Sequence, residues 1–247
     1  TTFPLVPYQV EMLNKINFGK FDLNYIKYLT IAGGKTTVQL LKNIYKICKD
    51  KKIKLFCMYG QAEATSRISY LDPKYLPQKI GSIGKPIIGG KLTIINKNGK
   101  MISAKNVKGE LVYKGKNVML GYSNSYKDLS NFLKQVKYLF TGDIAYKDND
   151  NFFYITGRKS RDIKIFSNRI NLDEIEDILK NKKFDCRCVS KNNLLKIFVL
   201  DKKQIDKIYE ILPPLININK SYLKAIYIKK FPLGLNKKVD YTALEKI

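Results

Sequence analysis

Asp143 and Arg158 are the charged residues whose spacing points most directly to chemistry. The glycine before Asp143 lets the backbone turn sharply and present the carboxylate. Two short apolar runs follow, joined by the Asp/Asn cluster 148–151, which is the pattern of a β-hairpin whose Asn151 can take a left-handed turn position. The hairpin would hold a carboxylate and a guanidinium at its opposite ends, where together they can grip a polyol and an anion. Taken singly, each is more often an ordinary surface turn residue.

A second chemical motif runs from Tyr59 to Glu63, directly after the apolar run 53–58. Tyr59 can stack on a purine, Gly60 allows close backbone approach, and Glu63 supplies the hard oxygen ligand that Mg²⁺ prefers. A pentapeptide of this kind is also found in ordinary strand-to-helix turns, so its neighbours in the fold must decide between the two readings.

The third candidate is Lys238, in the Pro- and Gly-shaped segment 231–241 ahead of a final helix. A lysine on such a loop is a mobile cation that can be carried into a cleft. In a lysine-rich chain, however, an isolated lysine more often belongs to the solvated surface.

The elements that must position the first loops read as a βαβ unit. A strand over 25–32 runs into Gly33-Gly34, Thr36 or Thr37 begins a helix, and 53–58 is a strand covered on both faces. This pattern predicts a parallel sheet, and ligands of such sheets sit at the carboxyl ends of the strands. Both the Gly33-Gly34 loop and the Tyr59-Gly60 loop fall there.

Short strands dominate the next part of the chain, and an α+β unit follows. Strands are expected over 92–95, 109–113 and 117–122, with a hairpin turn at Asn98-Gly99 and a short helix over 128–134. After Arg158 a capping pattern at Asn171 predicts a helix, and Pro213-Pro214 is expected to end another.

The order of these motifs resembles that of the AMP-forming adenylating enzymes, the superfamily of acyl-CoA synthetases, luciferase and peptide-synthetase adenylation domains. The resemblance is carried by Thr-Gly-Asp, the hairpin and Gly-Arg, followed by Lys164, Arg169 and Glu174. It covers essentially the whole chain, but only the later half of the family's length. It implies a large core, of which residues 1–158 would be the C-terminal part, and a small mobile domain over 159–247, with the hinge just after Arg158.

The resemblance also assigns roles to the candidate residues. Asp143 would hold the ribose hydroxyls, Arg158 would contact the nucleotide near ribose and phosphate, and Tyr59 would lie against adenine. Glu63 would bind Mg²⁺, and Lys238 would bridge the carboxylate and the α-phosphate during adenylation. The nucleotide-binding set expected from the two loops and the hairpin is Gly33, Gly34, Tyr59, Gly60, Gln61, Asp143 and Arg158.

Four positions depart from the family pattern. Ala62 replaces a threonine that helps to hold the AMP phosphate, and Ser160 stands at the hinge position. Ser167 replaces a glycine along the pantetheine path, and Lys237 replaces the glycine before Lys238, so Lys237 stays open as a partial substitute. The upstream phosphate loop of the family is not found in this sequence, so the fragment alone is expected to bind nucleotide weakly and to turn over little.

Composition narrows the possibilities further. A chain of 247 residues that is 45% hydrophobic can bury one or two cores. With no histidine, the chemistry must rest on carboxylates, lysine, arginine or the backbone. No run approaches the roughly 20 apolar residues of a membrane span, and there is no signal-peptide layout. The four cysteines read as free thiols of a reducing cytoplasm.

The net charge of +25 raises the question of nucleic acid. Arginine, the preferred reader of bases, is confined to Arg67, Arg158, Arg161, Arg169 and Arg187, while lysines are spread along the chain. This favours a lysine-coated surface over a nucleic-acid groove, although a catalytically inactive basic fragment acting as a scaffold or nucleic-acid binder remains the alternative.

The sequence therefore predicts an α/β plus α+β fold: the end of an adenylate-forming core, with a βαβ layer and a small β-barrel subdomain, followed by a mobile α+β domain. The expected function is ATP-dependent, AMP-forming ligation of a carboxylic acid. ATP or AMP and Mg²⁺ are the expected cofactors. CoA or the phosphopantetheine arm of an acyl or peptidyl carrier protein would be the acceptor.

Overall fold

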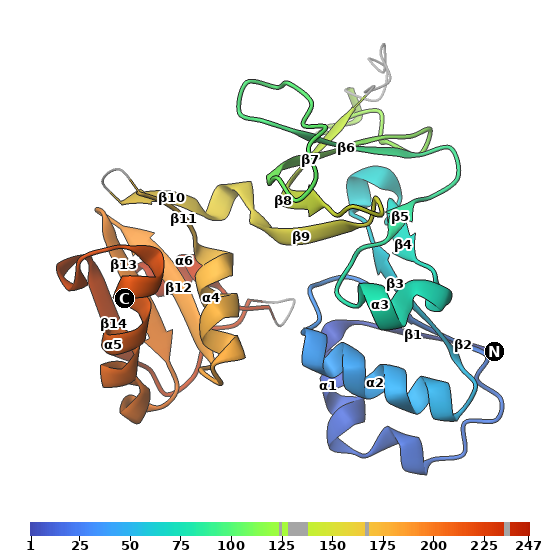
Figure 1. The fold of residues 1–247 in the computed structure, drawn as a ribbon, viewed down its shortest axis with the longest axis horizontal. Coiled ribbons are helices and arrows are strands. Elements are labelled where there is room, and N and C mark those ends of the chain that lie inside the picture. Colours follow the sequence, from blue (N-terminus) through green and yellow to red (C-terminus); the bar gives the residue numbers. More distant parts are fainter. Residues whose placement is uncertain (124, 128–137, 166–167, 235–237) are drawn as a thin grey trace. The chain divides into compact units, whose positions relative to one another are not determined.

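The chain folds into two compact units, Thr1–Ile155 and Thr156–Ile247, in a computed structural model (Figure 1). The structure describes residues 1–247 except 124, 128–137, 166–167 and 235–237. The helix expected over 128–134, Ser167 and Lys237 lie outside the described residues. The three residues Thr156–Arg158, expected at the end of the first domain, are grouped with the second unit.

The first unit contains a five-stranded sheet of order β1-β2-β3-β4-β5. Its strands are β1 Thr2–Leu5, β2 Tyr28–Ile31, β3 Lys54–Tyr59, β4 Ser69–Leu71 and β5 Lys85–Pro86. The first three are parallel to one another, which confirms the parallel arrangement predicted from the βαβ pattern, whereas β4 and β5 pair antiparallel. Parallel pairing brings the carboxyl ends of β1, β2 and β3 to one edge.

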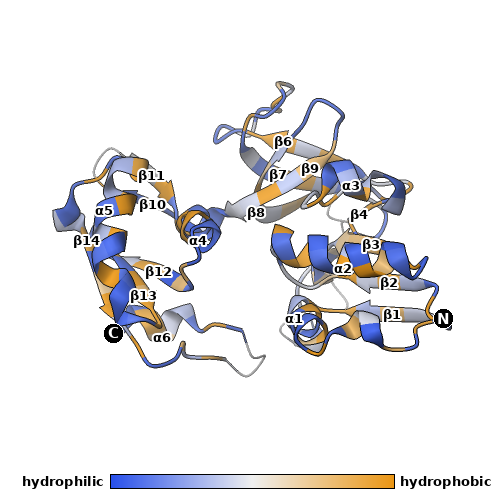
Figure 2. Ribbon diagram, turned by 60° about the horizontal axis from the view of Figure 1, so that its bottom comes forward, coloured by the Kyte–Doolittle hydropathy of each residue, from blue (hydrophilic) through white to orange (hydrophobic). Residues whose placement is uncertain are grey.

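Helices α1 (Pro7–Lys15) and α2 (Val38–Asp50) pack on this sheet. Thr37 caps α2, because its hydroxyl accepts a 3.3 Å hydrogen bond from the N–H of Leu40. The apolar face of α2 buries Leu41, Ile44 and Cys48, while its polar residues remain on the outside (Figure 2). The short helix α3 (Leu76–Lys79) follows β4.

A second sheet of the chain has the order β6-β7-β8-β9. Its strands are β6 Lys91–Ile95, β7 Gly109–Lys114, β8 Leu139–Lys147 and β9 Phe153–Arg158. The predicted hairpin joins β8 and β9, and Asn151 has φ +63°, the expected left-handed turn conformation. In the part of the chain that is described, these strands form an open sheet and no closed barrel.

The strand predicted over 117–122 was wrong. Residues 117–122 carry no strand, because their polar groups bind the loop after β3 instead of a neighbouring strand. The side-chain amide of Asn117 donates to the carbonyls of Ala64 (2.7 Å) and Arg67 (2.8 Å). These bonds tie the segment to the loop after β3.

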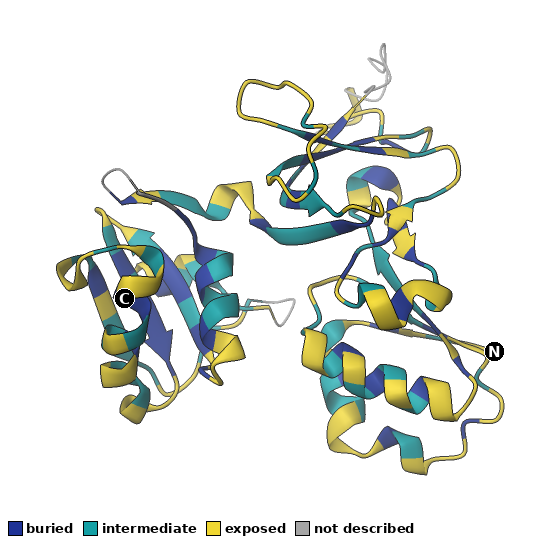
Figure 3. Ribbon diagram, in the orientation of Figure 1, coloured by how far each residue is buried: buried dark blue, intermediate teal, exposed yellow. Residues whose placement is uncertain are grey.

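The second unit is an α+β unit built on a three-stranded sheet of order β12-β13-β14, whose buried strands appear dark in Figure 3. Its elements are β10 Asp162–Ile165, β11 Asn168–Asn171, α4 Leu172–Asn181, β12 Cys186–Lys191, β13 Leu194–Val199, α5 Ile205–Ile216, β14 Leu223–Tyr227 and α6 Tyr241–Glu245. Asn171 caps α4 by accepting from the N–H groups of Asp173 and Glu174, which confirms the predicted helix start.

Helix α5 does not end at Pro213-Pro214 as predicted but continues to Ile216. The two prolines remove two backbone donors from the last turn. Buried Leu212 and Pro213 nevertheless anchor that turn, and Asn217 ends the helix with φ +51°. Among the residues that the structure describes, no helix is long and apolar enough to cross a membrane.

Candidate functional site

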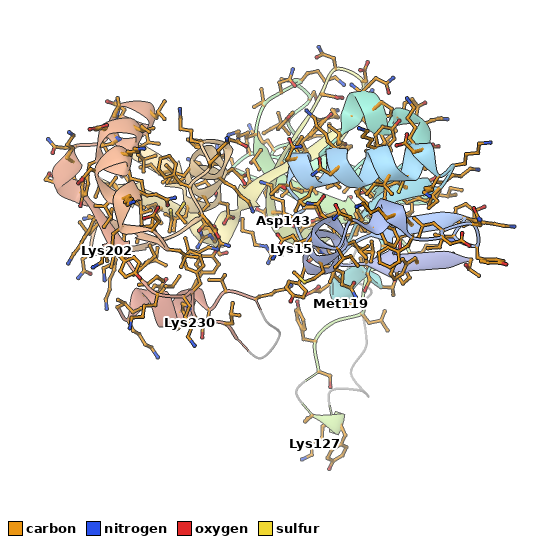
Figure 4. The ribbon with its side chains drawn as sticks, turned by 90° about the horizontal axis from the view of Figure 1, so that it is seen from below. Lys15, Met119, Lys127, Asp143, Lys202 and Lys230 are labelled. Carbon is orange, nitrogen blue, oxygen red and sulfur yellow. The ribbon has the colours of Figure 1, made fainter. Side chains whose placement is uncertain are left out.

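The centre of the candidate site is a hydrogen bond between two predicted residues, Tyr59 and Asp143. The hydroxyl of Tyr59, at the end of β3, donates to Oδ2 of Asp143 over 2.5 Å. Asp143, labelled in Figure 4, lies in β8 and is only 4% exposed. The structure therefore brings the Tyr-Gly motif and the Thr-Gly-Asp motif to one place, although they are far apart in sequence.

The sharp turn predicted at Gly142 is instead an irregularity within β8, where Gly142 has φ +71° and the register with β7 shifts, and Thr141 fixes it. Its hydroxyl donates to the carbonyl of Leu111 over 2.8 Å and accepts from the N–H of Asp143 over 3.2 Å. The side-chain amide of Gln61 donates to the carbonyl of Thr141 over 3.4 Å, so a third predicted residue joins the group. Sequence reasoning treated Thr141 only as part of the turn, and its role depends on β7, which no local pattern reveals.

Tyr59 stays protonated in this environment. Burial raises the pKa of Tyr59, and the nearby Asp143 carboxylate raises it further. The hydroxyl therefore acts as a hydrogen-bond donor to Asp143 over the whole physiological pH range. This interaction holds the carboxylate in a defined orientation at the carboxyl end of the sheet.

Gly60 is required by the close return of its own loop. A Cβ on Gly60 would lie 2.4 Å from the carbonyl oxygen of Ser66, a distance at which the backbone would have to move. The loop closes through a 2.9 Å hydrogen bond from the N–H of Ser66 to the carbonyl of Gln61. The glycine thus lets the chain fold back tightly after Tyr59.

Glu63 is held on both its backbone and its side chain by the segment 117–122. Its carbonyl accepts from the N–H of Met119 over 2.7 Å, and its Oε1 accepts from the hydroxyl of Tyr122 over 2.8 Å. The sequence analysis placed Tyr122 in an expected strand over 117–122 and missed this contact. No local pattern reveals this contact, because Tyr122 is 76% exposed and its partner is selected by the tertiary fold.

No three acidic, cysteine or histidine side chains of the described residues gather into a metal site. Mg²⁺ usually takes one or two protein carboxylates and completes its shell with water and phosphate oxygens. Glu63, which is half-buried at the sheet edge, fits that pattern as a single protein ligand beside a nucleotide.

The Gly33-Gly34 loop lies on the same edge of the first sheet, directly after β2. Gly33 has φ +84°, and a Cβ on Gly34 would come within 3.2 Å of Pro7, the first residue of α1. The parallel pairing of β1, β2 and β3 sets this loop and the Tyr59-Gly60 loop at the same side of the sheet.

Arg158 and Lys238 belong to the second unit. The backbone of Arg158 is tied to the start of α4, because its N–H donates to Asp173 (2.9 Å) and its carbonyl accepts from Asn171 (3.0 Å), while its side chain is exposed. Lys238 is also exposed, and its carbonyl accepts from the N–H of Gly234 over 2.8 Å.

Comparisons with known proteins agree on one family. Residues 1–123 match the sequence profile of the AMP-binding enzyme family. The chain is 35% identical over 151 residues to a 2-succinylbenzoate–CoA ligase of Geobacillus kaustophilus, which is 61% of this chain and 29% of the relative. It is 32% identical over 169 residues to the ligase of that name from Bacillus anthracis, 68% of this chain and 33% of the relative.

Solved structures share the fold. The chain resembles the O-succinylbenzoate CoA synthetase of Bacillus subtilis in complex with its acyl-adenylate intermediate, with a TM-score of 0.76 and 24% identity over 99% of this chain and 51% of that one. An amide bond synthetase from Marinactinospora thermotolerans gives a TM-score of 0.76 at 17% identity, over 100% of this chain and 51% of the other. The chain thus spans about a third of the matched ligases' length and about half of these solved chains.

Proposed function

This chain belongs to the AMP-binding enzyme family, and from that premise we propose that it is the C-terminal portion of an ATP-dependent ligase that activates a carboxylic acid as its adenylate. The observation that carries the proposal is the pair formed by Tyr59 and Asp143. A buried, oriented carboxylate that lies against the carboxyl end of β3 is suited to accept hydrogen bonds from the two hydroxyls of a ribose.

The residues around this pair have complementary tasks in nucleotide binding. The ring of Tyr59 and the backbone of Gly60 and Gln61 offer a flat surface for adenine, with Gly33 and Gly34 on the same edge of the sheet. Bound Mg²⁺ would neutralise phosphate charge, and Glu63 would be its protein ligand. The exposed guanidinium of Arg158 would steady the nucleotide between ribose and phosphate.

Lys238 would act in the chemical step. A carboxylate oxygen of the acid attacks the α-phosphorus of ATP and pyrophosphate leaves, so negative charge accumulates between the two reacting groups. An ammonium placed there stabilises the transition state more than the ground state. In the second step a thiolate attacks the acyl carbon of the adenylate, and AMP leaves.

CoA is the acceptor that we propose, because the matched curated relatives are named CoA ligases. Their names also make 2-succinylbenzoate the first acid to test. A phosphopantetheine arm on a carrier protein carries the same thiol chemistry and is the second acceptor to assay.

AMP binding to the 247-residue chain tests the nucleotide site. Titration calorimetry with AMP should give saturable binding, weakened at least about tenfold by Asp143→Asn, because the amide loses the negative charge and replaces one of the two acceptor oxygens with an NH2 donor. Asp72→Asn is the matched control, because it makes the same change at the residue that caps the short helix η3 (Pro73–Tyr75). It should leave AMP affinity unchanged. Equal affinity for wild type and Asp143→Asn would overturn the assignment.

A further inference from the structure

A network of charged and polar side chains inside the second unit joins the segments that carry Arg158 and Lys238. Its members are the side chains of Arg161, Asp173, Glu176 and Tyr241, together with the backbone of Cys188. The side chains of Arg161 and Glu176 are 14% and 15% exposed, so this ion pair is largely removed from water. Such a pair persists only when further hydrogen bonds satisfy its remaining donors and acceptors, and here they do.

The connector 157–162 is fastened to the first turn of α4 by Asp173. One carboxylate oxygen of Asp173 accepts from the N–H of Arg158 over 2.9 Å, and the other accepts from Nε of Arg161 over 2.5 Å. Gly157 lies so close to α4 that a Cβ there would come within 2.2 Å of Oδ1 of Asn171. The connector is therefore seated on the helix start rather than extended in solvent.

Glu176 is the link between this connector and the last helix. Its Oε1 accepts from Nη2 of Arg161 over 2.5 Å and from the N–H of Cys188 over 2.8 Å, while its Oε2 accepts from the hydroxyl of Tyr241 over 2.9 Å. The guanidinium carbon of Arg161 also lies 4.0 Å from the centre of the Tyr241 ring. One carboxylate thus connects three segments that are far apart in sequence.

Tyr241 carries the link on to the Lys238 loop. It begins α6 directly after Asp240, whose side chain caps that helix and whose N–H donates to the carbonyl of Pro232 over 2.9 Å. Leu233 and Val239 form an antiparallel bridge, so both sides of the loop's base are joined. Displacing Tyr241 would therefore displace the base of the loop that bears Lys238.

We propose that Glu176 is a positioning residue that holds the Arg158 connector and the base of the Lys238 loop (residues 231–234 and 238–240) in one frame, so that the two cations act as a pair. The ligand of Arg158 and Lys238 rests on the proposed function, whereas the hydrogen-bonded frame does not depend on it.

Hydrogen exchange of the 247-residue chain, measured by mass spectrometry, tests the frame without any nucleotide. Tyr241→Phe removes only the hydroxyl that Glu176 accepts and keeps the ring beside Arg161. Exchange should rise about three- to tenfold in peptides from the base of the Lys238 loop and also in the connector 157–162, since one net hydrogen bond is lost. If the Tyr241 hydroxyl stabilised only its own helix, hydrogen exchange in the connector 157–162 would not change.

Tyr209→Phe is the matched control in the same unit, because the Tyr209 hydroxyl donates to Leu223 and accepts from the N–H of Ala225. This variant should leave the hydrogen exchange of the connector 157–162 and of the base of the Lys238 loop unchanged. Glu176→Gln, which loses the charge opposite Arg161, should loosen both segments as Tyr241→Phe does. An exchange increase confined to α6, or none at all, in both variants overturns the frame. If the wild-type chain did not bind AMP, the proposed function would be overturned. The hydrogen-exchange result for the frame would still stand.

Discussion

Oδ2 of Asp143 accepts a 2.5 Å hydrogen bond from the hydroxyl of Tyr59, a residue that stands 84 positions earlier in the chain. The contact joins the end of β3 in the parallel sheet to β8 in the antiparallel sheet. Each of these residues was predicted to serve a nucleotide on the basis of its own motif. Their contact means that a change in one should be felt at the other.

Tyr59→Phe should destabilise the chain although the ring is kept. The variant leaves the buried Asp143 carboxylate without its hydroxyl donor, at a cost of about 1–3 kcal/mol in the free energy of unfolding. Urea unfolding followed by circular dichroism measures this cost. Tyr70→Phe, whose side chain lies on neighbouring β4 and is 39% exposed, should be nearly neutral, and equal stability of the two variants would contradict the prediction.

Gly60→Ala should be strongly destabilising, because the added Cβ would lie 2.4 Å from the Ser66 carbonyl oxygen. Overpacking against backbone costs at least about 1–3 kcal/mol. Gly121→Ala is the control, since nothing lies within 4 Å of a Cβ built there. Thermal unfolding should separate the two variants, and a Gly60→Ala protein as stable as wild type would show that the loop after β3 relaxes freely.

Lys238→Ala should leave folding intact and impair adenylation. The side chain is exposed, so its removal should change the melting temperature little. In a longer chain that supplies the phosphate loop, exchange of pyrophosphate into ATP in the presence of the acid should fall at least about 100-fold, the scale of losing one transition-state contact.

Lys237→Ala provides the comparison for this loop and should reduce exchange much less. A large loss in Lys237→Ala alone would move the catalytic role by one residue. Equal exchange by wild type and Lys238→Ala would remove the role from this loop.

The ion pair between Lys79 and Asp148 should make part of the stability depend on pH. Nζ of Lys79 lies 2.8 Å from Asp148 and 2.5 Å from Asp150. Burial by itself would raise the pKa of Asp148, but the hydrogen bond from Lys79 and the N–H of Phe152 outweigh it and hold this pKa below its ordinary value. The folded state therefore favours the ionised carboxylate.

Proton linkage gives the direction in which the free energy of unfolding changes with pH. Because the folded pKa of Asp148 is depressed, its stabilising contribution is present above the unfolded pKa of about 3.9 and is lost as pH falls through the folded pKa. Asp148→Asn should thus be less stable than wild type near pH 7, and the difference should shrink below about pH 4. Urea midpoints across pH 2.5–7 measure it, and a pH-independent difference would contradict the assignment.

Binding to oligonucleotides should be weak and strongly dependent on salt. The net charge of +25 attracts polyanions at low ionic strength, but scattered lysines should not give sub-micromolar affinity near 150 mM salt. Fluorescence anisotropy with single- and double-stranded probes checks this. Tight binding at that salt concentration would favour the basic scaffold over the ligase.

Local patterns in the sequence determined most of the elements. The Gly-Gly loop with a threonine cap, the Asn151 turn and the Asn171 cap each depend on a few neighbouring residues, so they could be predicted and are found; of the two candidates Thr36 and Thr37, Thr37 is the cap. The predictions were wrong where residues distant in sequence determine the local structure. Asn117 satisfies carbonyls of the loop after β3 instead of pairing in a strand, and buried Leu212 and Pro213 carry α5 through its prolines.

The candidate site shows the same division between features predictable from local sequence and features fixed by the tertiary structure. The motifs and their resemblance to the adenylating enzymes pointed to Tyr59, Glu63, Asp143 and Lys238, because short motifs can be read from neighbouring residues. Only the tertiary structure decided that Tyr59 binds Asp143, that Tyr122 binds Glu63, and that Glu176 joins Arg161 to Tyr241. These contacts span long stretches of sequence, and their partners are selected by the burial of polar groups that must be satisfied, which is a property of the packed chain and not of any segment.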